Sequence, residues 1–264
     1  MAQRPDDARP LRLSTPAERV LLITLARPEA ANAFDTAMAQ ALAEALSALP
    51  AETRCVILTG EGERAFCAGA DLKERRGLGE AAWRAQHRVF EAMGRALRDL
   101  PVPLIGAVNG AAYGGGCEIA LLCDFLYAST GARFALTETT LGLIPGLGAT
   151  QTLARAAGAR RAKEAIFTGR PFSAEEALAW GVVNRVCEPG ALLAQAVETA
   201  GRIAANAPLA VRAAKRAVDG GAALPLPKAM DLELECYETL VSTHDRLEGV
   251  RAWNEKRKPV FKGE

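Results

Sequence analysis

The chain is poor in the residue types that mark several common kinds of site. It has only two histidines, and its six cysteines form no CxxC pair, so a structural zinc site is not expected. Neither GxGxxG nor a GK[ST] P-loop occurs, which removes the usual signals of a dinucleotide or nucleoside triphosphate site. We therefore predict no metal and no resident cofactor.

An excess of charge of one sign is also lacking. The 32 basic and 31 acidic residues leave a formal net charge of +1, which predicts no strong attraction to nucleic acid or to an anionic membrane. No apolar run approaches the roughly 20 residues needed to span a bilayer. The N-terminal segment lacks the apolar core of a secretion signal, and cysteines within apolar stretches suit a reducing compartment. We expect a cytoplasmic protein that does not act at a membrane.

The apolar residues present alternate between strand-like and helix-like spacing. Strands that are apolar throughout and separated by helices predict an α/β fold, with a sheet covered on both faces. Residues 1–16 are expected to be a loose leader, residues 17–190 a core domain, and residues 191–264 a helical region that packs on the core or on a neighbouring subunit. The predicted strands are 20–25, 55–59, 103–108, 125–128 and 133–136, and the predicted helices include 36–49 and 80–100.

Two segments rich in small residues differ from ordinary scaffold. Gly114, Gly115 and Gly116 follow a predicted strand and open a helix, so free N–H groups there suit an anion or a developing oxyanion. In FCAGADLKE (66–74), small residues allow a ligand to approach the main chain closely. A simple tight turn remains the alternative for the glycines.

Two glutamates complete a possible site. Glu118 lies on the first turn of an otherwise apolar helix, although it could merely complement the helix dipole. Glu138 precedes another glycine and proline loop, and taken alone it would be a solvated loop acid. Together, two loops of backbone donors and two carboxylates are what water addition across an α,β-unsaturated thioester requires.

These motifs resemble those of the crotonase (enoyl-CoA hydratase/isomerase) superfamily. FCAGADLKE, GGGCEIALLCD and ETTLGLIPGLGATQTL are similar to its signatures, and the spacing 138 − 118 = 20 matches its hydratases. The resemblance runs from Val20 to the C-terminus. It implies a spiral of repeated ββα units with a helical C-terminal trimerisation region, assembled as a homotrimer or a hexamer (a dimer of trimers). It also implies an acyl-CoA thioester substrate, with coenzyme A a part of the substrate.

The resemblance also implies roles for individual residues. The amides of Ala68 and Gly115 would form an oxyanion hole, Glu118 would activate water, and Glu138 would protonate the α-carbon. Glu29 stands where many relatives carry a lysine near the CoA phosphates, and Arg27 is expected to substitute for that lysine. Further expected substrate or CoA contacts are Ala30, Gly69, Ala70, Asp71, Leu72, Gly114, Pro145, Gly146, Trp253 and Lys256.

Within the family, both glutamates favour an enoyl-CoA hydratase over an isomerase or another acyl-CoA enzyme. The motifs are closest to the methylglutaconyl-CoA hydratase branch of leucine breakdown, so Lys73, Arg75 or Arg76 could pair with a distal carboxylate; a solvated charge run is the alternative. An RNA-binding or non-catalytic homologue is disfavoured, because the helix over 36–49 contains no lysine or arginine for phosphate contacts. His87, in the middle of a predicted helix, is not expected to be catalytic.

Overall fold

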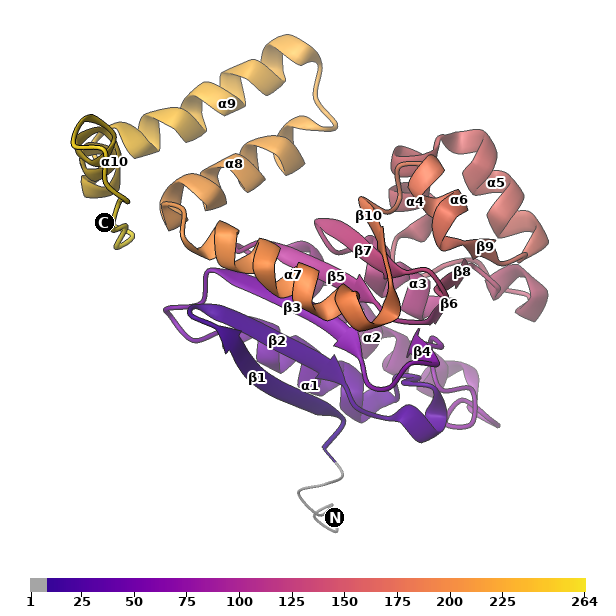
Figure 1. Ribbon diagram of the computed structural model, residues 1–264. Coiled ribbons are helices and arrows are strands. Elements are labelled where there is room, and N and C mark those ends of the chain that lie inside the picture. The colour runs from indigo at the N-terminus through magenta and orange to yellow at the C-terminus, as the bar shows by residue number, and fades with distance from the viewer. Residues whose placement is uncertain (1–8) are drawn as a thin grey trace.

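The structure is a computed structural model that describes residues 9–264. Two sheets form its centre (Figure 1). The larger has six strands in the order β1-β2-β3-β5-β7-β10, and all neighbours are parallel except β1 and β2. Its strands are β1 (Leu11–Ala17), β2 (Val20–Leu25), β3 (Cys55–Gly60), β5 (Leu104–Val108), β7 (Phe125–Ser129) and β10 (Arg185–Cys187).

The smaller sheet has the order β4-β6-β8-β9, and only its last pair is antiparallel. Its strands are β4 (Ala65–Cys67), β6 (Ala111–Tyr113), β8 (Arg133–Ala135) and β9 (Phe172–Ser173). Successive segments give one strand to each sheet and then a helix: β3, β4 and α2 (Glu80–Arg98), then β5, β6 and α3 (Gly115–Leu121). A third segment continues through β7, β8 and α4 (Ala149–Ala157). The repeated ββα units expected from the resemblance are confirmed.

Residues 11–16, assigned above to a loose leader, instead belong to β1. Only Leu11 of this strand is buried, so the alternation of buried and exposed residues that normally reveals a strand is weak here. Hydrogen bonding to β2 in a hairpin holds the strand in place. The rest of the predicted leader, residues 1–8, lies outside the described residues.

Both faces of the large sheet are covered. Helices α1 (Thr36–Ser47) and α2 lie behind it in Figure 1, and α7 (Pro189–Ala204) lies in front. Asp35 caps α1, because its Oδ1 accepts a 2.8 Å hydrogen bond from the Met38 amide. Helix α7 falls beyond the predicted core boundary at residue 190, yet four of its residues pack into the core on this face of the sheet: Leu192, Ala196, Ala200 and Ala204. Their four-residue spacing forms one face of the helix.

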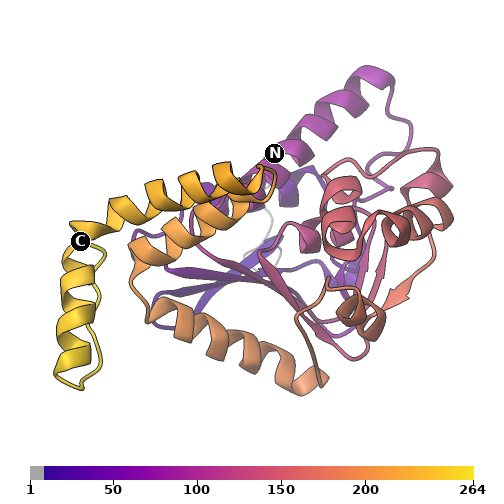
Figure 2. The ribbon, with the colours of Figure 1, turned by 90° about the horizontal axis from the view of Figure 1, so that it is seen from above.

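The remaining helices form two groups. A capping box of Ser173 and Glu176 starts α6 (Ala174–Ala179), and α5 (Ala159–Thr168) packs against α4. Helices α8 (Pro208–Gly221), α9 (Leu226–Val241) and α10 (His244–Asn254) extend from the opposite side of the molecule (Figures 1 and 2). Along α9 only Cys236 is buried, whereas Leu226, Met230, Leu234 and Tyr237 are exposed. No helix within residues 9–264 is both long and apolar enough to cross a bilayer.

Candidate active site

Glycine lets α3 begin directly against β4 and the loop that follows it. A methyl group on Gly116 would lie 2.0 Å from the carbonyl oxygen of Cys67, and one on Gly115 would lie 2.7 Å from Cζ of Phe34. Gly114, the N-cap, has a φ of +52°, which side chains rarely tolerate. The three glycines therefore bring the free N–H groups at the start of α3 next to residues 67–70.

The amide of Ala70, rather than that of Ala68, faces this helix start. The Ala68 N–H donates to the carbonyl of Ala31 at 3.0 Å, so it is already used. Phe34 forms a short parallel bridge with the loop: its N–H donates to the Gly69 carbonyl, and its carbonyl accepts from Asp71. This pattern turns the Ala70 N–H toward α3, where it lies 3.7 Å from the position of a methyl group on Gly115. The predicted Ala68 donor is thus corrected to Ala70.

The Gly115 amide is the second free donor. It is the first residue of α3, and no hydrogen-bond acceptor for it occurs within residues 9–264. The Gly114 amide, one residue earlier, donates to the Ala135 carbonyl at 2.8 Å. Two unpaired amides, of Ala70 and Gly115, therefore lie close together at the positive end of a helix.

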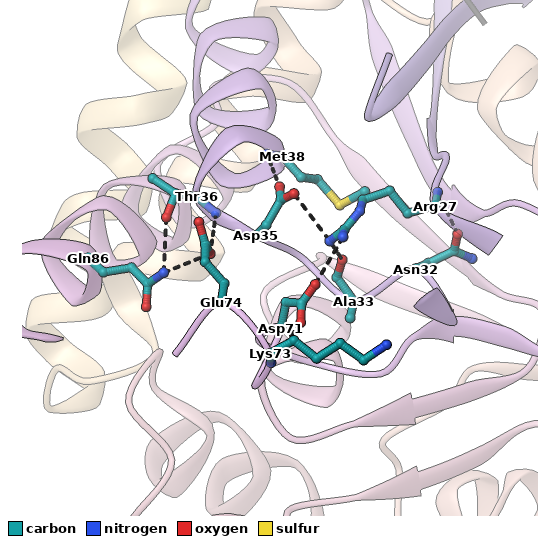
Figure 3. A network of polar contacts seen from close by, with 10 residues as sticks. All are labelled: Arg27, Asn32, Ala33, Asp35, Thr36, Met38, Asp71, Lys73, Glu74 and Gln86. Carbon is teal, nitrogen blue, oxygen red and sulfur yellow. Dashed lines mark hydrogen bonds and ion pairs between the residues drawn. The ribbon is translucent and has the colours of Figure 1, made fainter. Parts of the chain in front are cut away.

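Arg27 fixes the loop that carries Ala70 (Figure 3). Its guanidinium donates to the Ala33 carbonyl at 2.6 Å and to Asp71 Oδ2 at 2.9 Å, and it lies 3.4 Å from Asp35 Oδ2. Burial alone would raise the pKa of Asp71, but the hydrogen bonds from Arg27 and nearby backbone amides outweigh it and lower that pKa. The Arg27 side chain is 15% exposed. These three acceptors occupy the Arg27 guanidinium, and its contact with CoA phosphates stays a prediction.

Glu118 is held in a ring of backbone amides. Its Oε1 accepts from Leu147 at 2.7 Å and from Ala149 at 3.1 Å, and its Oε2 accepts from Gly146 at 3.2 Å. The side chain is buried, and burial raises its pKa although these amides oppose the shift. A buried carboxylate with this many donors can stay ionised and still be a usable base.

Glu138 faces the same space in a different environment. It starts the 3-10 helix η3 (Glu138–Leu141), and its Oε1 lies 3.2 Å from the position of a methyl group on Gly114. Its Oε2 is buried without a hydrogen-bond partner in the described part of the chain. Burial, followed by the nearby charge of Glu118, raises the pKa of Glu138 to about 7. Glu138 can therefore hold a proton near neutral pH, while Glu118 in the same cavity accepts hydrogen bonds from three backbone amides.

A cavity of about 440 Å³ joins these groups. It brings together ten of the predicted site residues: Ala68, Gly69, Ala70, Leu72, Gly114, Gly115, Glu118, Glu138, Pro145 and Gly146. Arg75, one of the three basic residues considered for a distal carboxylate, also lines the cavity. The lining residues that the sequence did not predict are Phe34, Trp83, His87, Phe90, Thr137, Leu141, Leu143, Ile144 and Leu147. Three of them, Trp83, His87 and Phe90, are spaced by four and three residues on α2 and so lie on one face of the helix. That spacing is the feature of the sequence that could have placed them together.

The other predicted contacts lie outside this cavity lining. Arg27 and Asp71 hold the loop, Ala30 ends the short helix η2 (Pro28–Ala30), and Lys256 follows α10. Trp253 is 84% exposed on α10. Their contacts with CoA stay predictions. Among residues 9–264, no three His, Cys, Asp or Glu side chains assemble into a metal-binding group.

The interleaved ββα units and a cavity containing two carboxyl groups and two free amides define a crotonase-fold protein. The sequence profile of the enoyl-CoA hydratase/isomerase family matches residues 15–264, and the chain belongs to that family. The Bacillus subtilis protein YngF is 45% identical over 248 residues, 93% of this chain and 95% of its own length. A short-chain-enoyl-CoA hydratase of Clostridium acetobutylicum is 40% identical over 242 residues, with 91% of this chain and 93% of that protein covered.

A solved structure supports the same conclusion. The crystal structure of an enoyl-CoA hydratase from Bacillus anthracis superimposes with a TM-score of 0.95 at 44% sequence identity. It covers 97% of this chain and all of that one. The match includes the C-terminal helices as well as the two sheets.

Proposed function

We propose that this protein is an enoyl-CoA hydratase, a hydro-lyase that adds water across the α,β double bond of an enoyl-CoA thioester. The observation that carries the proposal is the contrast between Glu118, held by three amides, and Glu138, whose pKa is raised to about 7. A base and an acid are thereby available near neutral pH in one cavity. Relatives named as enoyl-CoA hydratases support the same activity.

The free amides would act on the thioester carbonyl. In our proposal the N–H groups of Ala70 and Gly115 donate to the carbonyl oxygen, where negative charge develops as the enolate forms. The positive end of α3 favours the same charge. Removing one donor of this kind typically costs about 10²–10³-fold in rate.

The two glutamates would divide the proton transfers. Ionised Glu118 takes a proton from water as the oxygen bonds to the β-carbon, and protonated Glu138 gives its proton to the α-carbon. The double bond is consumed, one water is added, and return of the proton from Glu118 to Glu138 restores the site. Each positioned proton transfer contributes roughly 10²–10⁴-fold to the rate.

Product analysis separates this proposal from its main competitor, an enoyl-CoA isomerase. With crotonyl-CoA, a hydratase bleaches the absorbance of the conjugated thioester and forms 3-hydroxybutyryl-CoA. An isomerase instead converts a 3-enoyl-CoA to a 2-enoyl-CoA without adding water. Isomerisation with no hydration of crotonyl-CoA or of any other 2-enoyl-CoA would overturn the proposal.

Finer assignments are also proposals. The motif resemblance supports methylglutaconyl-CoA, an intermediate of leucine breakdown, as the substrate. The exposed apolar side chains of α9 and α10, among them Leu234, Tyr237 and Val250, support assembly into a trimer or hexamer. Cytoplasmic location remains the expectation from composition, and nucleic-acid binding remains disfavoured.

A further inference from the structure

Arg75 is held in the wall of the cavity by its inner nitrogen. Its Nε donates to Gln86 Oε1 at 3.0 Å, and its Cζ lies 4.1 Å from the centre of the Trp83 ring and 5.0 Å from that of Phe90. Both rings belong to α2. Stacking of this kind stabilises a guanidinium and restricts its orientation.

The support for Gln86 is itself buried. Gln86 is 8% exposed, and its Nε2 donates to Thr36 Oγ1 at 3.0 Å and to Glu74 Oε2 at 2.7 Å (Figure 3). The same Glu74 oxygen accepts from the Thr36 amide at 2.9 Å. Since hydrogen bonds engage both the oxygen and the nitrogen of the Gln86 amide, the Arg75 side chain is positioned before any ligand arrives.

The two terminal nitrogens of Arg75 are unused. Neither has a hydrogen-bond or ion-pair partner within residues 9–264. The guanidinium stays charged, because arginine does not lose its proton in proteins. The cavity is lined mainly by apolar side chains, among them Leu141 and Leu143, so paired donors in it favour a ligand that brings its own negative charge.

The other basic residues of this segment are placed differently. Lys73 and Arg76 are exposed and do not line the cavity. Arg75 is therefore the member of the basic run over residues 73–76 that can meet a substrate. A guanidinium presents two parallel N–H donors that match the two oxygens of a carboxylate.

We propose that Arg75 recognises a carboxylate at the far end of the acyl chain, so that the preferred substrates are enoyl thioesters with a distal carboxylate. This inference rests on the proposed hydratase function. It assigns a specificity role to one residue, and the competing explanation is that Arg75 only stabilises the fold by stacking on Trp83.

A ratio of two substrates tests the role without assuming unchanged basal activity. The assay compares hydration of glutaconyl-CoA, which ends in a carboxylate, with hydration of trans-2-hexenoyl-CoA, a neutral chain of similar length. We expect wild type to favour glutaconyl-CoA in kcat/KM. We expect Arg75→Gln to lower the ratio by roughly 10- to 100-fold, the scale of a lost hydrogen bond to a charged group. Arg75→Lys, which keeps the charge but loses the fork, should give an intermediate ratio.

Arg76→Gln is the matched control, because it removes the same charge one residue away on an exposed side chain. It should leave the ratio unchanged within about twofold. The inference is overturned if wild type shows no preference for the substrate with the carboxylate, or if Arg75→Gln lowers kcat/KM equally for both substrates. It is also overturned if Arg76→Gln changes the ratio of the two kcat/KM values as strongly as Arg75→Gln does.

Binding provides a readout that does not depend on turnover. Dissociation constants of glutaryl-CoA and hexanoyl-CoA, measured by calorimetry, should show the same preference and the same loss in Arg75→Gln. If no enoyl-CoA is hydrated but glutaryl-CoA still binds preferentially through Arg75, the hydratase function fails and the recognition of a carboxylate stands. If hydration is fast but neither ratio depends on Arg75, only this inference fails.

Discussion

The carboxylate of Glu118 raises the pKa of Glu138, adding to the larger effect of burial. Burial also raises the pKa of Glu118, but the hydrogen bonds that it accepts from the amides of Gly146, Leu147 and Ala149 oppose that shift. Two chemically identical groups thus acquire different proton affinities from their surroundings. This difference lets one cavity provide a base and an acid at the same pH.

The first prediction concerns the pH dependence of catalysis. Glu138 must be protonated to donate to the α-carbon, so kcat/KM for crotonyl-CoA should fall as pH rises above about 7. At lower pH it should fall again as Glu118 gains a proton. Steady-state rates between pH 5 and 9 at constant ionic strength check this. A profile that stays flat to pH 9 would rule out Glu138 as the proton donor.

The second prediction concerns stability. The pKa of Glu138 is raised in the folded state, so folding is favoured while the group is protonated and loses that contribution as pH rises from about 4.5 to about 7. Between pH 5 and 8, the free energy of unfolding of wild type should fall by about 1–2 kcal/mol more than that of Glu138→Gln, after allowing for partial exposure. Urea unfolding at both pH values measures the difference. If the free energy of unfolding changed equally between the two pH values in both proteins, that result would contradict the raised pKa of Glu138.

The third prediction concerns the close approach of α3 to β4. In Gly116→Ala the added methyl group would meet the backbone of Cys67 at 2.0 Å, so the loop bearing Ala70 must move away from Gly115. We expect kcat/KM to fall at least about 100-fold, as for loss of an oxyanion donor. Gly201→Ala in α7 is the control: nothing lies within 4 Å, and we expect unchanged activity with a gain of about 0.5–1 kcal/mol in stability. Near wild-type activity in Gly116→Ala would show that this contact does not position the amides.

The fourth prediction concerns the clamp made by Arg27. Arg27→Gln removes the partly buried cation that pairs with the carboxylates of Asp71 and Asp35, so we expect a loss of about 2–4 kcal/mol in the free energy of unfolding. Activity should also fall because the Ala70 loop is released. Arg84→Gln removes an exposed helical pair with Glu80 and should cost less than about 0.5 kcal/mol. Denaturant unfolding compares the two, and equal losses would contradict a specific role for Arg27.

Much of the fold was readable from the sequence because its buried strands and amphipathic helices follow regular spacing. Strand β1 was missed because five of its seven residues are exposed. Helix α7 was separated from the core because its buried residues are mostly alanine, which is weakly hydrophobic and equally common on exposed helices. What such a helix packs on depends on chain topology, which a local pattern does not contain.

The site was predictable in composition but not in detail. Glu118 and Glu138 line one cavity as expected, since Glu118 follows the glycines that open α3 and Glu138 precedes the loop that contains Pro145 and Gly146. Which amide of the FCAGADLKE loop is free depends on its bridge to Phe34 and on the bond from Ala68 to Ala31, contacts between segments distant in sequence. His87 was set aside for lying within a helix, yet its ring lies against Gly146 in the cavity wall.

The most direct test of the account measures hydration of crotonyl-CoA by wild type, Glu118→Gln and Glu138→Gln, together with the affinity of each protein for butyryl-CoA. The account predicts that wild type forms 3-hydroxybutyryl-CoA, that each variant is slower by roughly 10²–10⁴-fold, and that all three bind butyryl-CoA within a few fold of one another. Hydration by either variant at a rate close to wild type would contradict the assignment of the glutamates as the base and acid of the reaction.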